Sequence, residues 1–213
     1  MLDSFISRKA CNTYIFYNEN KDAILVDPGF NEGNRLIEHI EKIGVRVVAI
    51  LLTHAHFDHI TALEDVCTLF PNAITYISED ELELLDNPKF NLSLFRDDGL
   101  EKILTYVPSK LITLTDEEVI EAAGFKVKMI KTPFHTKGSA CYYVESENIL
   151  FSGDTLFYTS VGRTDLPTGS NRTVESSLAK LLTLPLETKI YAGHGVATTL
   201  ERESKYNVYL RNI

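Results

Sequence analysis

The chain has 213 residues, of which 44% are hydrophobic and 24% are charged, and its formal net charge is −9. This length and composition predict one globular domain, residues 1–213, with a sizeable core. The acidic balance, with no Lys- or Arg-rich run, argues against a nucleic-acid partner. No apolar run approaches the ~20 residues that span a bilayer, so we expect no membrane partner either.

The cysteine pattern and the N-terminus bear on location. Cys11, Cys67 and Cys141 are far apart and odd in number, which predicts reduced thiols rather than a disulfide framework. The first residues lack the basic segment and apolar stretch of a signal peptide. We therefore expect a cytoplasmic protein, and the sequence makes no prediction of its oligomeric state.

The first half of the chain predicts strands and helices in alternation. The expected elements are a strand over 10–17, a turn at 19–21, a strand over 22–27, a helix capped by Asn31 and ending near Ile43, a strand over 47–52, a helix over 63–70, a strand over 73–77 and a helix from the capping-box pair Ser78 and Glu81 to about Leu85. Residues 86–110 form a less regular excursion with a short helix over 99–105. This excursion either covers one rim of a site or is plain connecting surface.

The second half is richer in strands. The expected strands cover 119–122, 125–131, 140–145, 149–152 and 189–192, and the expected helices cover 173–182 and 201–210. Two strand-rich halves, each with its own helices, predict an α/β (α+β) protein built from two packed sheets with helices outside.

Candidate chemistry is concentrated just after the apolar strand 47–52. Within six positions the chain places His54, His56, Asp58 and His59. Ionisable side chains at the end of a buried strand are costly to bury without partners. Because imidazole and carboxylate are ligands for divalent metals, this segment predicts a metal site.

Three further residues follow later strands in the same way. His135, Asp154 and His194 each come just after a predicted strand, and glycines flank Asp154 and His194. One such residue is more often a cap or turn residue. Seven candidate ligands at strand ends are what a dinuclear metal site needs, and only His39, on a helix, is a histidine outside this pattern.

The order His54-x-His56-x-Asp58-His59, then His135, Asp154 and His194, resembles the metallo-β-lactamase superfamily over nearly the whole chain. Asp27-Pro28-Gly29 and Gly193-His194-Gly195 also fit. The stretch 162–167 and the tail from Thr198 to Asn207 are similar to small bacterial glyoxalase II-like hydrolases. The resemblance implies the metallo-β-lactamase fold, an αβ/βα four-layer sandwich of two mixed β-sheets flanked by helices, with metals at one edge.

The resemblance also implies the ligand sets of two divalent metal ions per chain. One ion would be held by His54, His56 and His135. The second would be held by Asp58, His59 and His194, and Asp154 would bridge the two. Such a set leaves positions open for water and substrate, as catalytic metal sites do. Zinc is expected ahead of iron or manganese.

The implied activity is metal-dependent hydrolysis by a thioesterase, a hydroxyacylglutathione hydrolase-like enzyme of the glyoxalase II type. A hydroxide bridging the metals would cleave S-D-lactoylglutathione or a related acyl-thiol, with Asp58 orienting the nucleophile. A thiolate leaving group needs little protonation, because a thiol has a pKa of about 8.5. Arg163 or Lys137 would pair with a substrate carboxylate. Phe134, where the family usually has glycine, would reshape the loop beside His135 and contact the substrate.

Departures from the family pattern leave the substrate open. The sequence after His194 is too short for the helical domain that contacts glutathione in larger glyoxalase II enzymes, and Val196 stands near the place of their tyrosine. Arg163 is equally consistent with an ordinary surface loop. The alternatives are a persulfide dioxygenase-like oxidoreductase with a single iron, another hydrolase of this fold such as a lactonase or β-lactamase, and a metal-binding domain without catalysis.

Overall fold

The computed structural model describes residues 1–6, 11–95, 103–211 and 213. It contains a first sheet of six strands that lie side by side in chain order. These strands are β1 (Leu2–Ile6), β2 (Asn12–Tyr17), β3 (Asp22–Val26), β4 (Arg46–Leu52), β5 (Ile74–Ser78) and β6 (Leu111–Leu114). The first three strands pair antiparallel, and β3 to β6 pair parallel, so the sheet is mixed.

The second sheet also has six strands, in the order β14-β13-β10-β9-β8-β7. Its strands are β7 (Val119–Ala122), β8 (Phe125–Lys131), β9 (Ala140–Val144), β10 (Ile149–Gly153), β13 (Lys189–Ala192) and β14 (Thr198–Thr199). Only the pair of β10 with β13 is parallel. Two short strands, β11 (Leu156–Phe157) and β12 (Ser160–Val161), form a separate hairpin between β10 and α4 in the chain.

The two sheets pack face to face around a shared apolar core. Ala49 and Leu51 of β4 face this core, where they join Met129 and Phe151 of the second sheet. The next residues along β4, such as Ile50, face the opposite side and pack under helices. Because successive side chains of a strand point to opposite faces, a strand buried on both faces needs a continuous apolar run.

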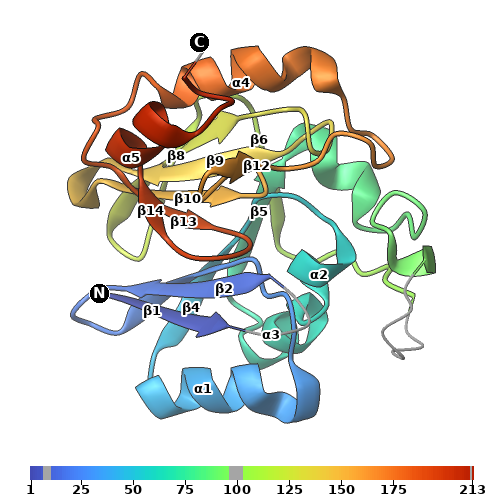
Figure 1. Cartoon of the computed structure of the whole chain (residues 1–213). Coiled ribbons are helices and arrows are strands. Elements are labelled where there is room, and N and C mark those ends of the chain that lie inside the picture. Colours follow the sequence, from blue (N-terminus) through green and yellow to red (C-terminus); the bar gives the residue numbers. More distant parts are fainter. Residues whose placement is uncertain (7–10, 96–102, 212) are drawn as a thin grey trace.

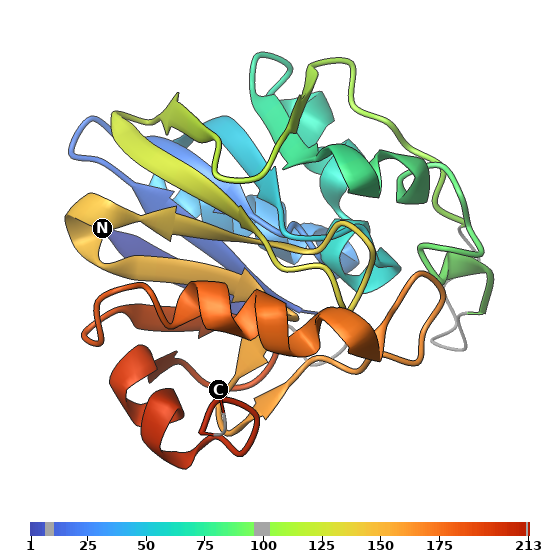
Figure 2. The ribbon, with the colours of Figure 1, turned by 90° about the horizontal axis from the view of Figure 1, so that it is seen from above.

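Helices cover the outer face of each sheet. The α-helices are α1 (Arg35–Ile43), α2 (Phe57–Ile60), α3 (Leu63–Leu69), α4 (Val174–Leu181) and α5 (Leu200–Tyr206), and the 3₁₀-helices are η1 (Glu32–Asn34), η2 (Glu79–Leu84), η3 (Ser93–Phe95), η4 (Glu145–Glu147) and η5 (Asn171–Thr173). Figure 1 shows α1 below the first sheet and α4 above the second, and Figure 2 shows α4 from above, lying across its sheet. Leu36 of α1 and Leu178 of α4 are fully buried against the sheets. The predicted four-layer sandwich is therefore confirmed.

Most predicted elements are present within a few residues of their expected bounds. The predicted cap residue is wrong, because α1 begins at Arg35 and its N-cap is Asn34. Asn31 still stabilises the first turn, since its Oδ1 accepts hydrogen bonds from the backbone N–H groups of Leu36 (3.1 Å) and Ile37 (3.3 Å). The strands β1, β6, β11, β12 and β14 were not predicted. They are short, and most lie at sheet edges, where pairing with a neighbour rather than an apolar pattern defines them.

Two further local predictions are wrong or lie outside the described residues. The predicted capping box is wrong, because the Ser78 side chain makes no cap hydrogen bond and the Glu81 side chain is fully buried. Of the predicted helix over 99–105, residues 99–102 lie outside the described residues, and 103–105 are not helical.

The three cysteines are free thiols; Cys11 and Cys141 are buried, and Cys67 is partly exposed. Among the residues that the structure describes, no helix is long and apolar enough to cross a membrane.

Candidate metal centre

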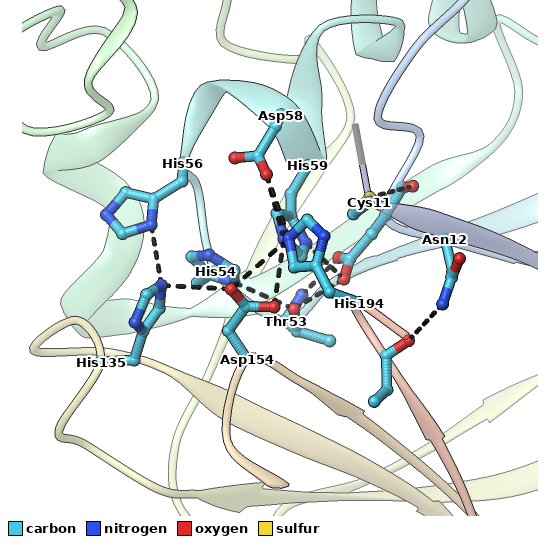
Figure 3. Close-up of polar contacts among 12 residues, drawn as sticks. Cys11, Asn12, Thr53, His54, His56, Asp58, His59, His135, Asp154 and His194 are labelled. Carbon is cyan, nitrogen blue, oxygen red and sulfur yellow. Dashed lines mark hydrogen bonds and ion pairs between the residues drawn. The ribbon is translucent and has the colours of Figure 1, made fainter. Parts of the chain in front are cut away.

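The seven candidate ligands meet at the carboxyl ends of strands from both sheets. β4 ends at Leu52, and the chain then places four ligands in the following loop and in α2. The other three follow β8, β10 and β13 of the second sheet. Figure 3 shows the seven side chains pointing toward one another. The carboxyl ends of parallel strands form the usual ligand-binding edge of layered α/β folds. The polar residues after the predicted strands indicated this edge in the sequence.

The ligand atoms form three close sets of three residues. Two of these sets share no residue, and the third, His54, His59 and Asp154, joins them. The three-histidine group consists of His54, His56 and His135, and the mixed group consists of Asp58, His59 and His194. Within each group the ligand atoms all lie within 4.8 Å of one another. In the three-histidine group, His56 Nδ1 lies 3.0 Å from His135 Nε2. In the mixed group, His194 Nε2 lies 3.2 Å from Asp58 Oδ2.

Asp154 lies between the two groups. Its Oδ2 is 3.5 Å from Nε2 of His135 and 3.6 Å from Nε2 of His194. Its Oδ1 is 3.4 Å from Nε2 of His59. Figure 3 shows the carboxylate with His135 on one side and the mixed group on the other. One carboxylate therefore contacts both groups, as a bridging ligand must.

The donor atoms fit divalent metal ions. Among the described residues, Nε2 of His54, Nε2 of His59 and Oδ1 of Asp154 are buried without a hydrogen-bond partner, which is costly unless something else satisfies them. Ligands at about 2.1 Å around a tetrahedral zinc would lie about 3.4 Å from one another. The contacts of 3.0–3.6 Å described above match that spacing.

Asp27 orients His59 from behind. It directly follows β3, in the left-handed region at φ 49°, and its side chain is buried. Asp27 Oδ2 lies 2.9 Å from Nδ1 of His59. Thr53 donates its backbone N–H to Asp27 Oδ1 (2.8 Å) and its hydroxyl to Oδ2 (2.7 Å). Asp27 holds a proton on Nδ1 of His59, and Nε2 of the ring then faces the centre. Carboxylates that hydrogen-bond to the second nitrogen of a metal-binding histidine orient the ring in this way.

Two other ligand histidines are oriented in the same way. Nδ1 of His135 donates to the backbone carbonyl of Arg163 over 2.8 Å. Nδ1 of His54 lies 3.2 Å from the Thr53 hydroxyl oxygen, which is already bound to Asp27 as a donor and therefore accepts. In both rings Nε2 is then free of a proton and faces the centre.

The two groups differ in charge when no metal is bound. Burial lowers the pKa of His54, His56 and His135, that of His56 to about 3, so these rings are neutral at pH 7. Burial would also lower the pKa of His59 and His194, but acidic neighbours outweigh it and raise both. The neighbours that raise the pKa of His59 are Cys11, Asp154, Asp58 and Asp27. The neighbours that raise the pKa of His194 are Asp58 and Asp154.

The two carboxylates are charged. Burial alone would raise the pKa of Asp58 and Asp154, but the neighbouring histidines, His59 first among them, outweigh it and lower both below the usual range. The three-histidine group is therefore ready to bind a cation without losing protons. The mixed group must release protons when a metal binds.

Solvent reaches the centre from one side. The histidines of the three-histidine group are at most 3% exposed, whereas the His194 side chain is 40% exposed and the Asp58 side chain 21%. A substrate would therefore approach over the mixed group.

The three predicted substrate contacts have different outcomes. Phe134 is fully buried in the core beneath α4, beside Leu178 and Leu181. The prediction that it contacts substrate is wrong, because the residue has no exposed surface. Lys137 forms an exposed ion pair with Glu83, and Arg163 holds Asp165 through two hydrogen bonds of 2.7 Å. Their contact with substrate stays a prediction.

Sequence reasoning missed the roles of Asp27, Thr53 and Glu81. Asp27 had a usable signal, because it is an acidic residue directly after an apolar strand. Thr53 is an ordinary strand-end residue in sequence. Glu81 fits a capping-box pattern in the sequence, so its hydrogen bonds to Ala55 and Gly138, in the loops that carry His54, His56 and His135, were not predicted.

This chain is similar to known proteins over nearly its whole length. The family model of the metallo-beta-lactamase superfamily matches residues 6–194. Hydroxyacylglutathione hydrolase GloC of Haemophilus influenzae is 32% identical over 202 residues, which cover 94% of this chain and 93% of GloC. Two crystal structures are also similar. BLEG-1 B3 metallo-beta-lactamase has a TM-score of 0.90 and 37% identity, covering 99% of both chains. TTHA1623 in a di-iron-bound form has a TM-score of 0.82 and 31% identity, covering 96% of this chain and 98% of its own.

The chain therefore belongs to the metallo-beta-lactamase superfamily. Family and site together define a metal-dependent hydrolase.

Proposed function

We propose that this protein is a glyoxalase II-type thioesterase that hydrolyses S-D-lactoylglutathione or a related small acyl-thiol in the cytoplasm. It would use two divalent metal ions, with zinc ahead of iron or manganese. The main observation is the placement of Asp154 between two complete three-residue groups, which suits a dinuclear centre. The similarity to GloC supports an acyl-thiol substrate, and three free thiols fit a reducing compartment.

The chemistry divides between the bound ions and the chain. Bound divalent metals lower the pKa of a water from about 15.7 toward about 7 and polarise a carbonyl oxygen. Asp58 is charged and partly exposed on the open side of the centre, so it can accept a hydrogen bond from the attacking water and orient it. His194 beside it defines the rim over which the acyl group approaches.

The leaving group favours a thioester over an amide. All seven side chains that surround the centre are ligand candidates, which leaves no dedicated proton donor among them. A thiolate leaves without one because its pKa is about 8.5, whereas an amide nitrogen needs a proton. β-Lactam and lactone hydrolysis share the attacking step, and the resemblance to BLEG-1 makes a β-lactam a necessary comparison substrate.

The recognition of a substrate carboxylate is proposed for Arg163 or Lys137. Both cations are exposed and already paired with acidic neighbours. A substrate carboxylate would have to exchange for Asp165 at Arg163 or for Glu83 at Lys137. The bidentate geometry that Arg163 makes with Asp165 is the one that it would make with a carboxylate of the glutathione moiety.

A mononuclear iron oxidoreductase of the persulfide dioxygenase type is the second candidate. Such a site needs two histidines and one carboxylate. A single iron would leave one of the two groups without a metal, although the ligand atoms within each group are brought within 4.8 Å of one another. This convergence favours the dinuclear hydrolase.

One combined experiment tests the proposal. Metal is quantified on the purified protein, and rates are compared for several acyl-thiols, a lactone and a β-lactam, with oxygen uptake measured on glutathione persulfide. We expect two metals per chain and the highest kcat/KM for an acyl-thiol. One iron with oxygen uptake, or a faster β-lactam reaction, would contradict the proposal.

The variant His56→Ala should lose metal and hydrolysis together, because His56 is one of the three buried histidines of its group. His39→Ala is the matched control, since His39 lies on α1 and pairs with Asp3 at 3.4 Å, outside the centre. Normal metal content and full activity in His56→Ala would refute the ligand assignment.

A further inference from the structure

Glu81 is a fully buried carboxylate that belongs to neither ligand group. It lies on η2, just after β5, and its side chain turns inward instead of capping a helix. Burial raises the pKa of Glu81 to about 7, although hydrogen bonds from Thr136, Ala55 and Gly138 oppose that effect. A carboxylate buried at such a cost is retained only where its contacts matter.

The two oxygens of Glu81 accept hydrogen bonds from the two loops that supply the three-histidine group. Oε2 accepts the backbone N–H of Ala55 over 2.9 Å, and Ala55 stands between His54 and His56. Oε1 accepts the backbone N–H of Gly138 over 3.0 Å, three residues after His135. One side chain therefore joins both loops through their main chains.

Gly138 packs directly against the backbone of Glu81. A Cβ atom at Gly138 would lie 2.6 Å from Glu81 N and 2.7 Å from Glu81 Cγ. No side chain fits there, so the loop that follows His135 is held against η2. The Thr136 hydroxyl adds a further hydrogen bond to the Glu81 carboxylate.

Only a carboxylate of this length provides both acceptors. A glutamine has one acceptor oxygen and one NH₂ group, so one of the two backbone N–H groups would face a donor. An aspartate is one methylene shorter and would not reach both loops. The main-chain positions of Ala55 and Gly138 thus depend on the two acceptor oxygens and the length of this side chain.

We propose that Glu81 is a positioning residue that sets the distance between the His54–His56 loop and His135, and so controls metal occupancy of the three-histidine group. The proposal rests on the metal ligands of the proposed function. Glu81 makes no described contact with the mixed group. Its effect should therefore be selective for one of the two groups.

Two backgrounds let each group be measured alone. His194→Ala leaves the three-histidine group, and His56→Ala leaves the mixed group. In each background Glu81→Gln is compared with Glu81 by titrating the metal-free protein with zinc against a chromophoric chelator. We expect Glu81→Gln to weaken zinc binding about 10- to 100-fold in the first background, the usual effect of losing a supporting residue. In the second background the change should stay below about threefold.

Glu203→Gln is the matched control. Glu203 is equally buried, but its oxygens accept from the Thr159 backbone N–H, the Thr198 hydroxyl and the side chains of Arg202 and Asn207, all outside the two ligand loops. It should leave zinc binding unchanged in both backgrounds. Circular dichroism verifies that each variant is folded.

The outcomes separate the two proposals. Zinc affinity unchanged by Glu81→Gln in the His194→Ala background, or reduced equally in both backgrounds, overturns the role of Glu81 and leaves the proposed function intact. Failure of His56→Ala to remove a zinc site instead overturns the ligand assignment. If Glu81→Gln does not fold, Thr136→Val, which removes one hydrogen bond to Glu81, decides the question. It should weaken the three-histidine group several-fold, and no selective change would overturn the proposal.

Discussion

Asp27→Asn tests whether the residue behind His59 controls the mixed group. Asp27 is 2% exposed and accepts three hydrogen bonds, two from Thr53 and one from His59 Nδ1. Asparagine can accept the Thr53 backbone N–H with its oxygen only by turning its NH₂ group toward the Thr53 hydroxyl and His59. His59 must then place its proton on Nε2, the atom that faces the centre.

The expected loss follows from that change of tautomer. Removing a partner behind a metal-binding histidine typically costs 10–100-fold in metal affinity, or about 1.4–2.7 kcal/mol. The metal-free protein should also lose stability, because the pKa of His59 is raised in the folded state, in part by Asp27. The pair stabilises the fold fully below about pH 6.5, and this stabilisation is lost as the pH rises through the folded pKa of His59.

The assay is a zinc titration in the His56→Ala background, where only the mixed group remains, together with thermal unfolding of metal-free protein at two pH values. Asp3→Asn is the control, because Asp3 also pairs with a histidine, His39, at 3.4 Å, but on the surface. It should change neither quantity. Zinc affinity of Asp27→Asn within twofold of its parent would refute the reasoning.

Two further outcomes are expected. In Gly193→Ala the new Cβ would lie 2.4 Å from Asp154 Oδ1, so the Asp154 carboxylate must move. We expect kcat/KM to fall at least about tenfold, and metal content is measured on the same samples. An unchanged kcat/KM would show that Asp154 does not need this position. Zinc affinity of the mixed group should fall as the pH is lowered from about 8 to 6, because its histidines have raised pKa values and protons compete with the metal. Zinc affinity of the three-histidine group should change much less, because its histidines have lowered pKa values. Calorimetry in buffers of different ionisation enthalpy measures the protons released, and equal release from both groups would contradict this.

The ligands could be found from sequence because each is tied to a strand end. A buried strand such as β4 is visible as a continuous apolar run, and four histidine and aspartate side chains follow it within a few residues. His135, Asp154 and His194 stand out by the same rule. Their division between two ions came from the family resemblance, since nothing in the spacing says that His56 meets His135, 79 residues away.

What could not be predicted depends on long-range packing. Ser78 and Glu81 have the spacing of a helix cap, and only the loop around Gly138, 57 residues further on, turns Glu81 inward. Phe134 was placed near substrate because it adjoins His135, but α4 offers it an apolar core that the local sequence does not show. Edge strands such as β14 have two residues and no pattern of their own.

The position of the centre between the two sheets has a consequence for folding. The loop after β4 belongs to the first half of the chain, whereas His135, Asp154 and His194 follow strands of the second. An ion held by both halves acts as a reversible cross-link, formed only when the sheets are packed together. A ligand that binds only the folded state stabilises it by about 4 kcal/mol at 1,000 times its dissociation constant. The supply of metal would then set how long the sandwich survives unfolding and proteolysis, quite apart from any turnover of substrate.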